Sequence, residues 1–109
     1  MAKQTYNQQT LQALTLFGQH IRYGRKRLKM TVASLAERLG VSRSTVQMME
    51  KGTGTVAIGT YFEAASLLDI SLFQDDYMNI SQQQARIEDK IALLPKHIHA
   101  QKSEVNDDF

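Results

Sequence analysis

Residues 31–52 constrain the fold of this chain most strongly, because they predict two short helices joined by a tight glycine turn. Thr31 is a suitable N-cap for the first helix, and Ser42 is one for the second. Gly40 lies between them, where a helix must end and where glycine best tolerates a left-handed conformation. Apolar residues recur at helical spacing in both helices: Leu35, Ala36, Leu39, Val46 and Met49.

The second predicted helix has a polar outer face. With Val46 and Met49 buried, the side chains left pointing outward are Arg43, Ser44, Gln47 and Met48. A compact helix pair with hydrogen-bonding side chains at the start of its second helix fits the major groove of DNA. The alternative is an ordinary helical hairpin, in which Arg43 and Gln47 are only solvated.

The distribution of charge favours the DNA interpretation. From His20 to Lys51, eight Lys and Arg residues stand against two Glu residues, which gives a net charge of +6. From Thr60 to the end, four basic residues stand against nine acidic ones, which gives −5. The formal total of +2 therefore hides a basic half that suits a polyphosphate backbone and an acidic half that avoids it.

The run IRYGRKRLKMTVASLAERLGVSRSTVQMMEKG resembles the helix-turn-helix domain of Cro, lambda-type repressors and the xenobiotic-response-element regulators. The resemblance covers about residues 16–70, with Met30 and Val46 as conservative replacements. The matching residues are Ile21, Arg22, Arg25, Thr31, Leu35, Ala36, Gly40, Val41, Ser42, Glu50 and Gly52.

Two departures and one match in this alignment have consequences. Val32 stands where the family usually has a phosphate-binding glutamine, which puts that contact in doubt. Lys29 replaces the usual glycine between the first two helices and offers a charge to the DNA backbone instead. Arg25 and Glu50 align with a pair that forms a structural salt bridge in relatives, although as free surface charges they would contribute little.

The resemblance also implies which residues contact DNA. Arg43, Ser44 and Gln47 occupy the positions that reach base edges, and Thr45 lies nearer the backbone. The threonines of the following loop match a segment that lies along the backbone in relatives, although turn formation alone also explains them. The predicted backbone contacts are Ser42, Thr45, Lys26, Lys29, Lys51, Thr53 and Thr55.

The stretch GTGTVAIGTYFEAASLLDISLF looks like the HipB-type subfamily, the DNA-binding partners of HipA toxin kinases. It predicts a fourth helix over about Thr60–Leu68 that buries Phe62, Ala65 and Leu68, and then a short strand at Ile70–Phe73. An isolated strand cannot satisfy its backbone, so a second copy of the chain is its simplest partner. The predicted dimerisation residues are Ile70, Leu72 and Phe73.

Two further helices flank this region. The first runs from about Thr10 to Leu28 and has a stripe of Leu14, Phe17, Ile21 and Leu28. The last spans Gln82–Leu94, with Ser81 and Gln84 as a capping box and Pro95 at its end. The fold class is all-α, a lambda-repressor-like helix-turn-helix bundle with a short dimerising strand and a C-terminal helix.

The domain boundaries follow from these elements. Residues 1–9 form a flexible N-terminus, 10–69 the DNA-binding domain, 70–94 the dimerisation strand and helical extension, and 95–109 a polar mobile tail.

Several functional classes have no support. The chain has no cysteine, and His97 and His99 have no obvious third ligand nearby, so we expect neither a metal nor a cofactor. No nucleophile with a base and an orienting group is recognisable, which predicts a protein that is not an enzyme. No apolar run approaches the roughly 20 residues of a membrane span, and no signal segment opens the chain. A cytoplasmic protein is expected.

Together these features predict a homodimeric repressor that binds operator DNA and autoregulates a toxin-antitoxin operon, with a HipA-like kinase as its partner. The first alternative is a free-standing, phage-type regulator without a toxin. The second is a protein-interaction module that has lost DNA binding and works through its acidic half.

Overall fold

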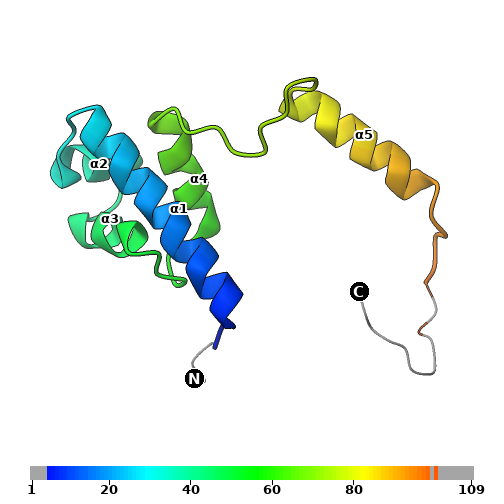
Figure 1. The fold of residues 1–109 in the computed structure, drawn as a ribbon, viewed down its shortest axis with the longest axis horizontal. Helices are drawn as coiled ribbons and strands as arrows, with labels where there is room; N and C mark the ends of the chain where they lie inside the picture. Colours follow the sequence, from blue (N-terminus) through cyan, green and yellow to red (C-terminus); the bar gives the residue numbers. More distant parts are fainter. Residues whose placement is uncertain (1–4, 99, 101–109) are drawn as a thin grey trace. The chain divides into compact units, whose positions relative to one another are not determined.

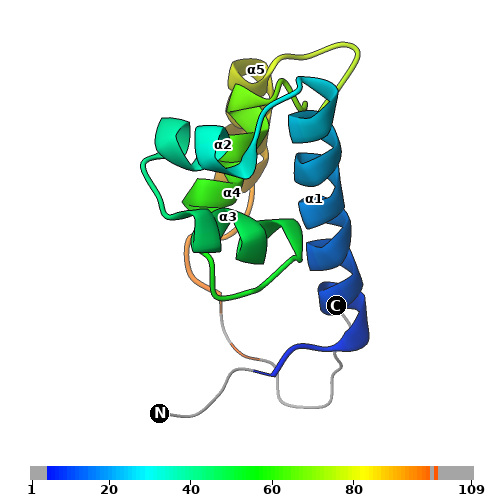
Figure 2. The same ribbon diagram turned by 90° about the vertical axis from the view of Figure 1, so that its left-hand side faces the viewer.

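The computed structural model describes residues 5–98 and residue 100. Its helices are α1 (Gln8–Arg27), α2 (Val32–Leu39), α3 (Arg43–Glu50), α4 (Ile58–Leu67) and α5 (Ile80–Ala92), shown in Figure 1. The chain divides into two units, the first ending at Leu72 and the second beginning at Phe73. The first unit is a four-helix bundle, in which α1 lies along one side of α2, α3 and α4 (Figure 2). The second contains α5.

The caps of α2 and α3 confirm the predicted helix pair. The Thr31 hydroxyl accepts a hydrogen bond from the Ser34 N–H at 2.9 Å, and Ser42 Oγ accepts one from the Thr45 N–H at 3.1 Å. Each bond satisfies one of the amide groups that a helix leaves without a partner in its first turn. Gly40 ends α2 in the left-handed conformation, with φ of 72°. Local sequence therefore sets both ends of the turn.

The core of the first unit lies between α2, α3 and α4 and is closed by one side of α1. Its members come from all four helices: Ile21, Leu35, Ala36, Val46, Met49, Tyr61, Ala64 and Leu68. Phe17 of α1 closes the bundle against α4, with its ring centroid 5.0 Å from that of Tyr61. Two predictions about this core are wrong, since Phe62 is 36% exposed and Leu28 44% exposed.

Two glycines allow α1 to approach the end of α3 closely. A Cβ atom added at Gly18 would lie 2.5 Å from the Met49 carbonyl oxygen, well inside van der Waals contact. A Cβ atom at Gly52 would lie 2.5 Å from the Leu14 carbonyl oxygen, and Gly52 also has a φ of +79°. Both close approaches hold α1 against the C-terminal end of α3, so they fix the position of α3 relative to α1.

The strand predicted at Ile70–Phe73 is not seen in the part of the chain that the structure describes. Strand formation needs a second backbone to receive the ladder hydrogen bonds, and one copy offers none here. Ile70 instead donates its N–H to the Ala65 carbonyl at 2.8 Å and packs on the core beside Gly24. Phe73 turns the chain with a left-handed φ of 56°.

The helix ends also differ from the predicted ones. The N-cap of α5 is Asn79 rather than Ser81, and Asn79 forms the capping box with Gln82. Each of the two candidate caps is followed three residues later by a glutamine, so the local pattern does not distinguish them. The first helix begins and ends slightly before its predicted bounds, and α4 begins at Ile58 rather than Thr60.

The predicted flexible ends lie partly outside the described residues. Among the described helices, none is both long and apolar enough to cross a membrane.

Candidate nucleic-acid interface

The outer face of α3 is polar and open. Val46 and Met49 are fully buried, whereas Arg43, Ser44 and Gln47 are exposed. Thr45 is half-buried, and its hydroxyl lies 3.0 Å from that of Ser42. The three predicted base-contacting residues therefore share one accessible face, which is the geometry that direct reading of base edges requires.

The position of α3 is fixed by a buried ion pair with α1. Arg25 Nε donates to Glu50 Oε2 at 2.6 Å, and Nη2 donates to Oε1 at 3.1 Å. Nη1 of the same guanidinium donates a third hydrogen bond, to the Met30 carbonyl oxygen at 2.9 Å. Only about a tenth of either charged side chain is exposed, at 10% and 8%. The hydrogen bond to Glu50 raises the pKa of Arg25 further, and burial opposes this only in part.

A hollow of about 270 Å³ lies beside this pair. Val32 at the start of α2 forms one part of its lining, and Gln47 of α3 another. Arg22 and Lys51, both exposed, place two positive charges around it. The hollow thus lies next to the reading face and has the charge that attracts a phosphate.

The loop after α3 is held by α4. Tyr61 donates its hydroxyl hydrogen to the Thr53 carbonyl at 2.7 Å, and burial raises the pKa of this phenol. Thr53 is half-buried and Thr55 exposed, so the side chain of Thr55 is the more accessible of the two. The hydrogen bond fixes the path of the loop that we expect to follow the DNA backbone.

The helix-turn-helix family matches residues 21–74, which contain the whole of α2, α3 and α4. Residues 21–74 belong to this family. Its members are DNA-binding regulators rather than enzymes. No curated protein matches the chain. Among solved structures, a complex of a HipB variant with an O2 20mer is similar, with a TM-score of 0.50 and 19% identity. That similarity covers 72% of this chain and 100% of the HipB chain, and at this identity it shows the fold alone.

Within the helix-turn-helix domain, Lys29 shows the consequence of replacing a glycine. It connects α1 to α2 with a φ of 60°, a left-handed conformation that costs an L-amino acid roughly 1–2 kcal/mol. The domain therefore keeps the turn that glycine usually makes there, and carries an exposed positive charge on it. Lys26 and Lys51 are likewise exposed.

Sequence reasoning missed Arg22 as a candidate contact. It matches the family motif, yet only the structure places it around the hollow with Gln47 and Lys51. The available signal was its spacing, because Arg22 precedes Arg25 by three residues and so lies on the same side of α1.

No group of three or more metal-ligating side chains occurs among the described residues. His99, half of the H-x-H pair considered above, lies outside them.

Proposed function

We propose that this protein is a sequence-specific transcriptional repressor that acts as a homodimer on operator DNA. Arg43, Ser44 and Gln47 read base edges in the major groove. The observation that carries the proposal is their exposure on one face of a helix that Arg25 and Glu50 hold in place. Arg43 has the planar fork that matches guanine O6 and N7, and Gln47 matches adenine. We assign the protein to the cytoplasm, where such a regulator meets its DNA.

The surrounding charges hold the phosphate backbone. The predicted contacts are Ser42, Thr45, Lys26, Lys29, Lys51, Thr53 and Thr55. To these we add Arg22, because Val32 at the start of α2 has no polar side chain to offer and Arg22 lies around the same hollow. A guanidinium in this place supplies the phosphate contact that the family's glutamine usually makes.

The experiment that tests DNA binding uses the DNA upstream of the protein's own coding sequence. We expect the logarithm of the affinity to fall linearly with the logarithm of salt concentration, since each bound phosphate releases condensed counterions. Arg22→Ala should reduce the slope by about one unit, and Arg86→Ala in the second unit should leave it unchanged. Binding that is independent of salt would show that the basic half does not hold DNA.

A toxin-antitoxin role is the finer form of the proposal. It is supported by the resemblance to HipB-type proteins in sequence and by the fold shared with a HipB chain. In this role the acidic half, with its −5 charge, stays off the DNA and is open to a HipA-like kinase. The test is co-expression with the product of the adjacent reading frame. A kinase-like product that co-purifies with this chain supports the role, and an unrelated neighbour favours a free-standing regulator.

A further inference from the structure

Helix α5 buries none of its residues within the described part of its own unit. It has 13 residues, and a helix of that length is marginal in water unless packing stabilises it. Its large apolar side chains are more than half exposed, with Ile80 at 56%, Ile87 at 52%, Ile91 at 54% and Leu94, just past its end, at 62%. A capping box nevertheless fixes its start. The exposed apolar side of α5 therefore needs a second surface to pack against.

The spacing of these residues is that of a coiled-coil seam. Ile80, Gln84, Ile87, Ile91 and Leu94 follow one another at intervals of four, three, four and three residues. This alternation assigns them to the d and a positions of a heptad repeat, and we call them the α5 seam. A seam of this kind is covered by a second helix with the same repeat.

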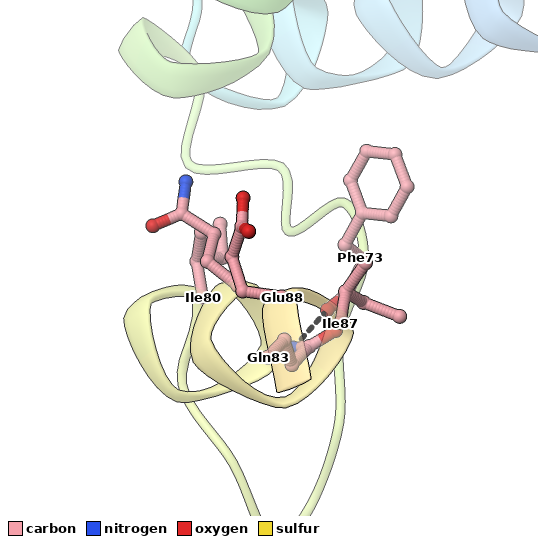
Figure 3. Close-up of a pocket in the computed structure, with 6 residues that line it drawn as sticks. Phe73, Ile80, Gln83, Ile87 and Glu88 are labelled. Carbon is pink, nitrogen blue, oxygen red and sulfur yellow. Dashed lines mark hydrogen bonds between the residues drawn. The ribbon is translucent and has the colours of Figure 1, made fainter. Parts of the chain in front are cut away.

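The surroundings of the seam are visible in Figure 3, where Phe73, Ile80 and Ile87 flank a hollow of about 370 Å³. The Gln83 side chain donates to the Phe73 carbonyl at 2.9 Å and to the Met78 carbonyl at 3.2 Å. These bonds hold the turn before α5 against the helix. The first turn of α5, where the seam begins, is therefore held in place, and the phenyl ring of Phe73 lies beside it.

We propose that the α5 seam pairs with the α5 seam of a second copy, parallel and in register. Gln84 is the only polar member of the seam. In a parallel pair it meets Gln84 of the other copy and the two amides hydrogen-bond, as single polar residues at a positions do. In the antiparallel pair of greatest overlap, the amide is buried against Ile87 without a partner, a loss that disfavours this orientation.

Charge is compatible with the parallel orientation. Glu88 occupies an e position, next to the seam. The parallel pair places it opposite Gln83 of the other copy, which is neutral, so no like charges face each other there.

This inference rests on the proposed function for its purpose. A parallel pair joins the two chains at the start of α5, a few residues after the DNA-binding unit ends at Leu72. Two DNA-binding units joined in this way are kept available for two half-sites, which lie about 34 Å apart, one turn of DNA. The seam would set the symmetry of the operator without touching it.

The test measures assembly of the full chain without DNA, so its failure is separate from a failure of DNA binding. We expect sedimentation at tens of micromolar to show a dimer for the natural chain. Ile87→Asp should give a monomer, because it places a carboxylate in the seam, and Ala85→Asp, off the seam, should remain dimeric. Circular dichroism and thermal unfolding should show that the first unit of each variant is folded.

Orientation is tested by cross-linking, since the chain has no natural cysteine. Gln84→Cys should form a disulfide dimer on mild oxidation, whereas Arg86→Cys, on another side of the helix, should not. A monomeric natural chain would overturn the proposal and leave the seam to another protein. A dimer that survives Ile87→Asp, or a Gln84→Cys variant that does not cross-link, would also overturn it.

Discussion

The Arg25 guanidinium of α1 donates hydrogen bonds to both carboxylate oxygens of Glu50, the last residue of α3. The donor–acceptor distances are 2.6 and 3.1 Å. The pair joins the long supporting helix to the helix that presents the reading face. A bidentate, largely buried ion pair has one favoured geometry, so it fixes the direction of α3 more than a surface pair does.

Breaking this pair should be costly from either side. Arg25→Ala or Glu50→Ala leaves one buried charge without a partner, and each should lower the free energy of unfolding by about 3 kcal/mol. The double variant should lose clearly less than the sum of the two. Denaturant unfolding of the three variants measures this coupling, and additive losses would mean that the two groups do not interact.

The close approach at Gly18 gives a second prediction. Gly18→Ala forces a methyl group against the Met49 and Glu50 carbonyls, and it should destabilise the protein by about 2 kcal/mol despite alanine's better helix propensity. Gly59→Ala is the matched control, because that position in α4 opens onto free space. It should stabilise the protein slightly. Equal effects at the two sites in thermal unfolding would argue against the packing.

Lys29 allows conformation and charge to be separated. Lys29→Gly removes the strain of the left-handed turn and should stabilise the fold by roughly 1 kcal/mol, whereas Lys29→Ala keeps the strain. Both variants remove the charge, so both should bind DNA more weakly by the same factor. Stability is measured by denaturant and affinity by titration with DNA. If Lys29→Gly and Lys29→Ala both stabilised the fold, relief of backbone strain would not be the cause of the gain in stability.

Tyr61 predicts a dependence on high pH. Tyr61→Phe loses the hydrogen bond to the Thr53 carbonyl and should cost about 1 kcal/mol at neutral pH. Because burial raises the pKa of Tyr61, the folded state holds this proton more tightly than the unfolded state. Stability should therefore fall as the pH rises above the ordinary tyrosine value of about 10. The fall should be smaller in Tyr61→Phe, and unfolding curves recorded on either side of that pH will show the difference.

Features set by neighbouring residues can be predicted from the sequence, as the caps of α2 and α3 show. Thr31 and Ser42 each act within three residues, and Gly40 follows its helix directly. The burial of Val46 and Met49 follows from periodicity alone. The sequence is therefore sufficient to identify the outer face of α3.

Features that depend on distant residues cannot be predicted in this way. Tyr61 is buried while Phe62 is 36% exposed, and the Tyr61 hydroxyl donates to the Thr53 carbonyl in a loop whose path no local pattern reveals. The expectation of a strand at Ile70–Phe73 rests on a resemblance, and within one chain its first residue packs on α1 instead. The roles of Ile70, Leu72 and Phe73 in dimerisation, and of the proposed DNA contacts, stay predictions.

The measurement that tests the central claim most directly compares Arg43→Ala on two DNA duplexes, the protein's own operator and a scrambled sequence of equal length. If Arg43 reads a base, its loss should weaken operator binding by about 1–3 kcal/mol, roughly 5- to 150-fold, with far less effect on the scrambled duplex. The matched control is Arg86→Ala, which removes the same charge from α5 and should change neither affinity. Equal losses by Arg43→Ala on both duplexes would contradict the account, because Arg43 would then contact only the backbone.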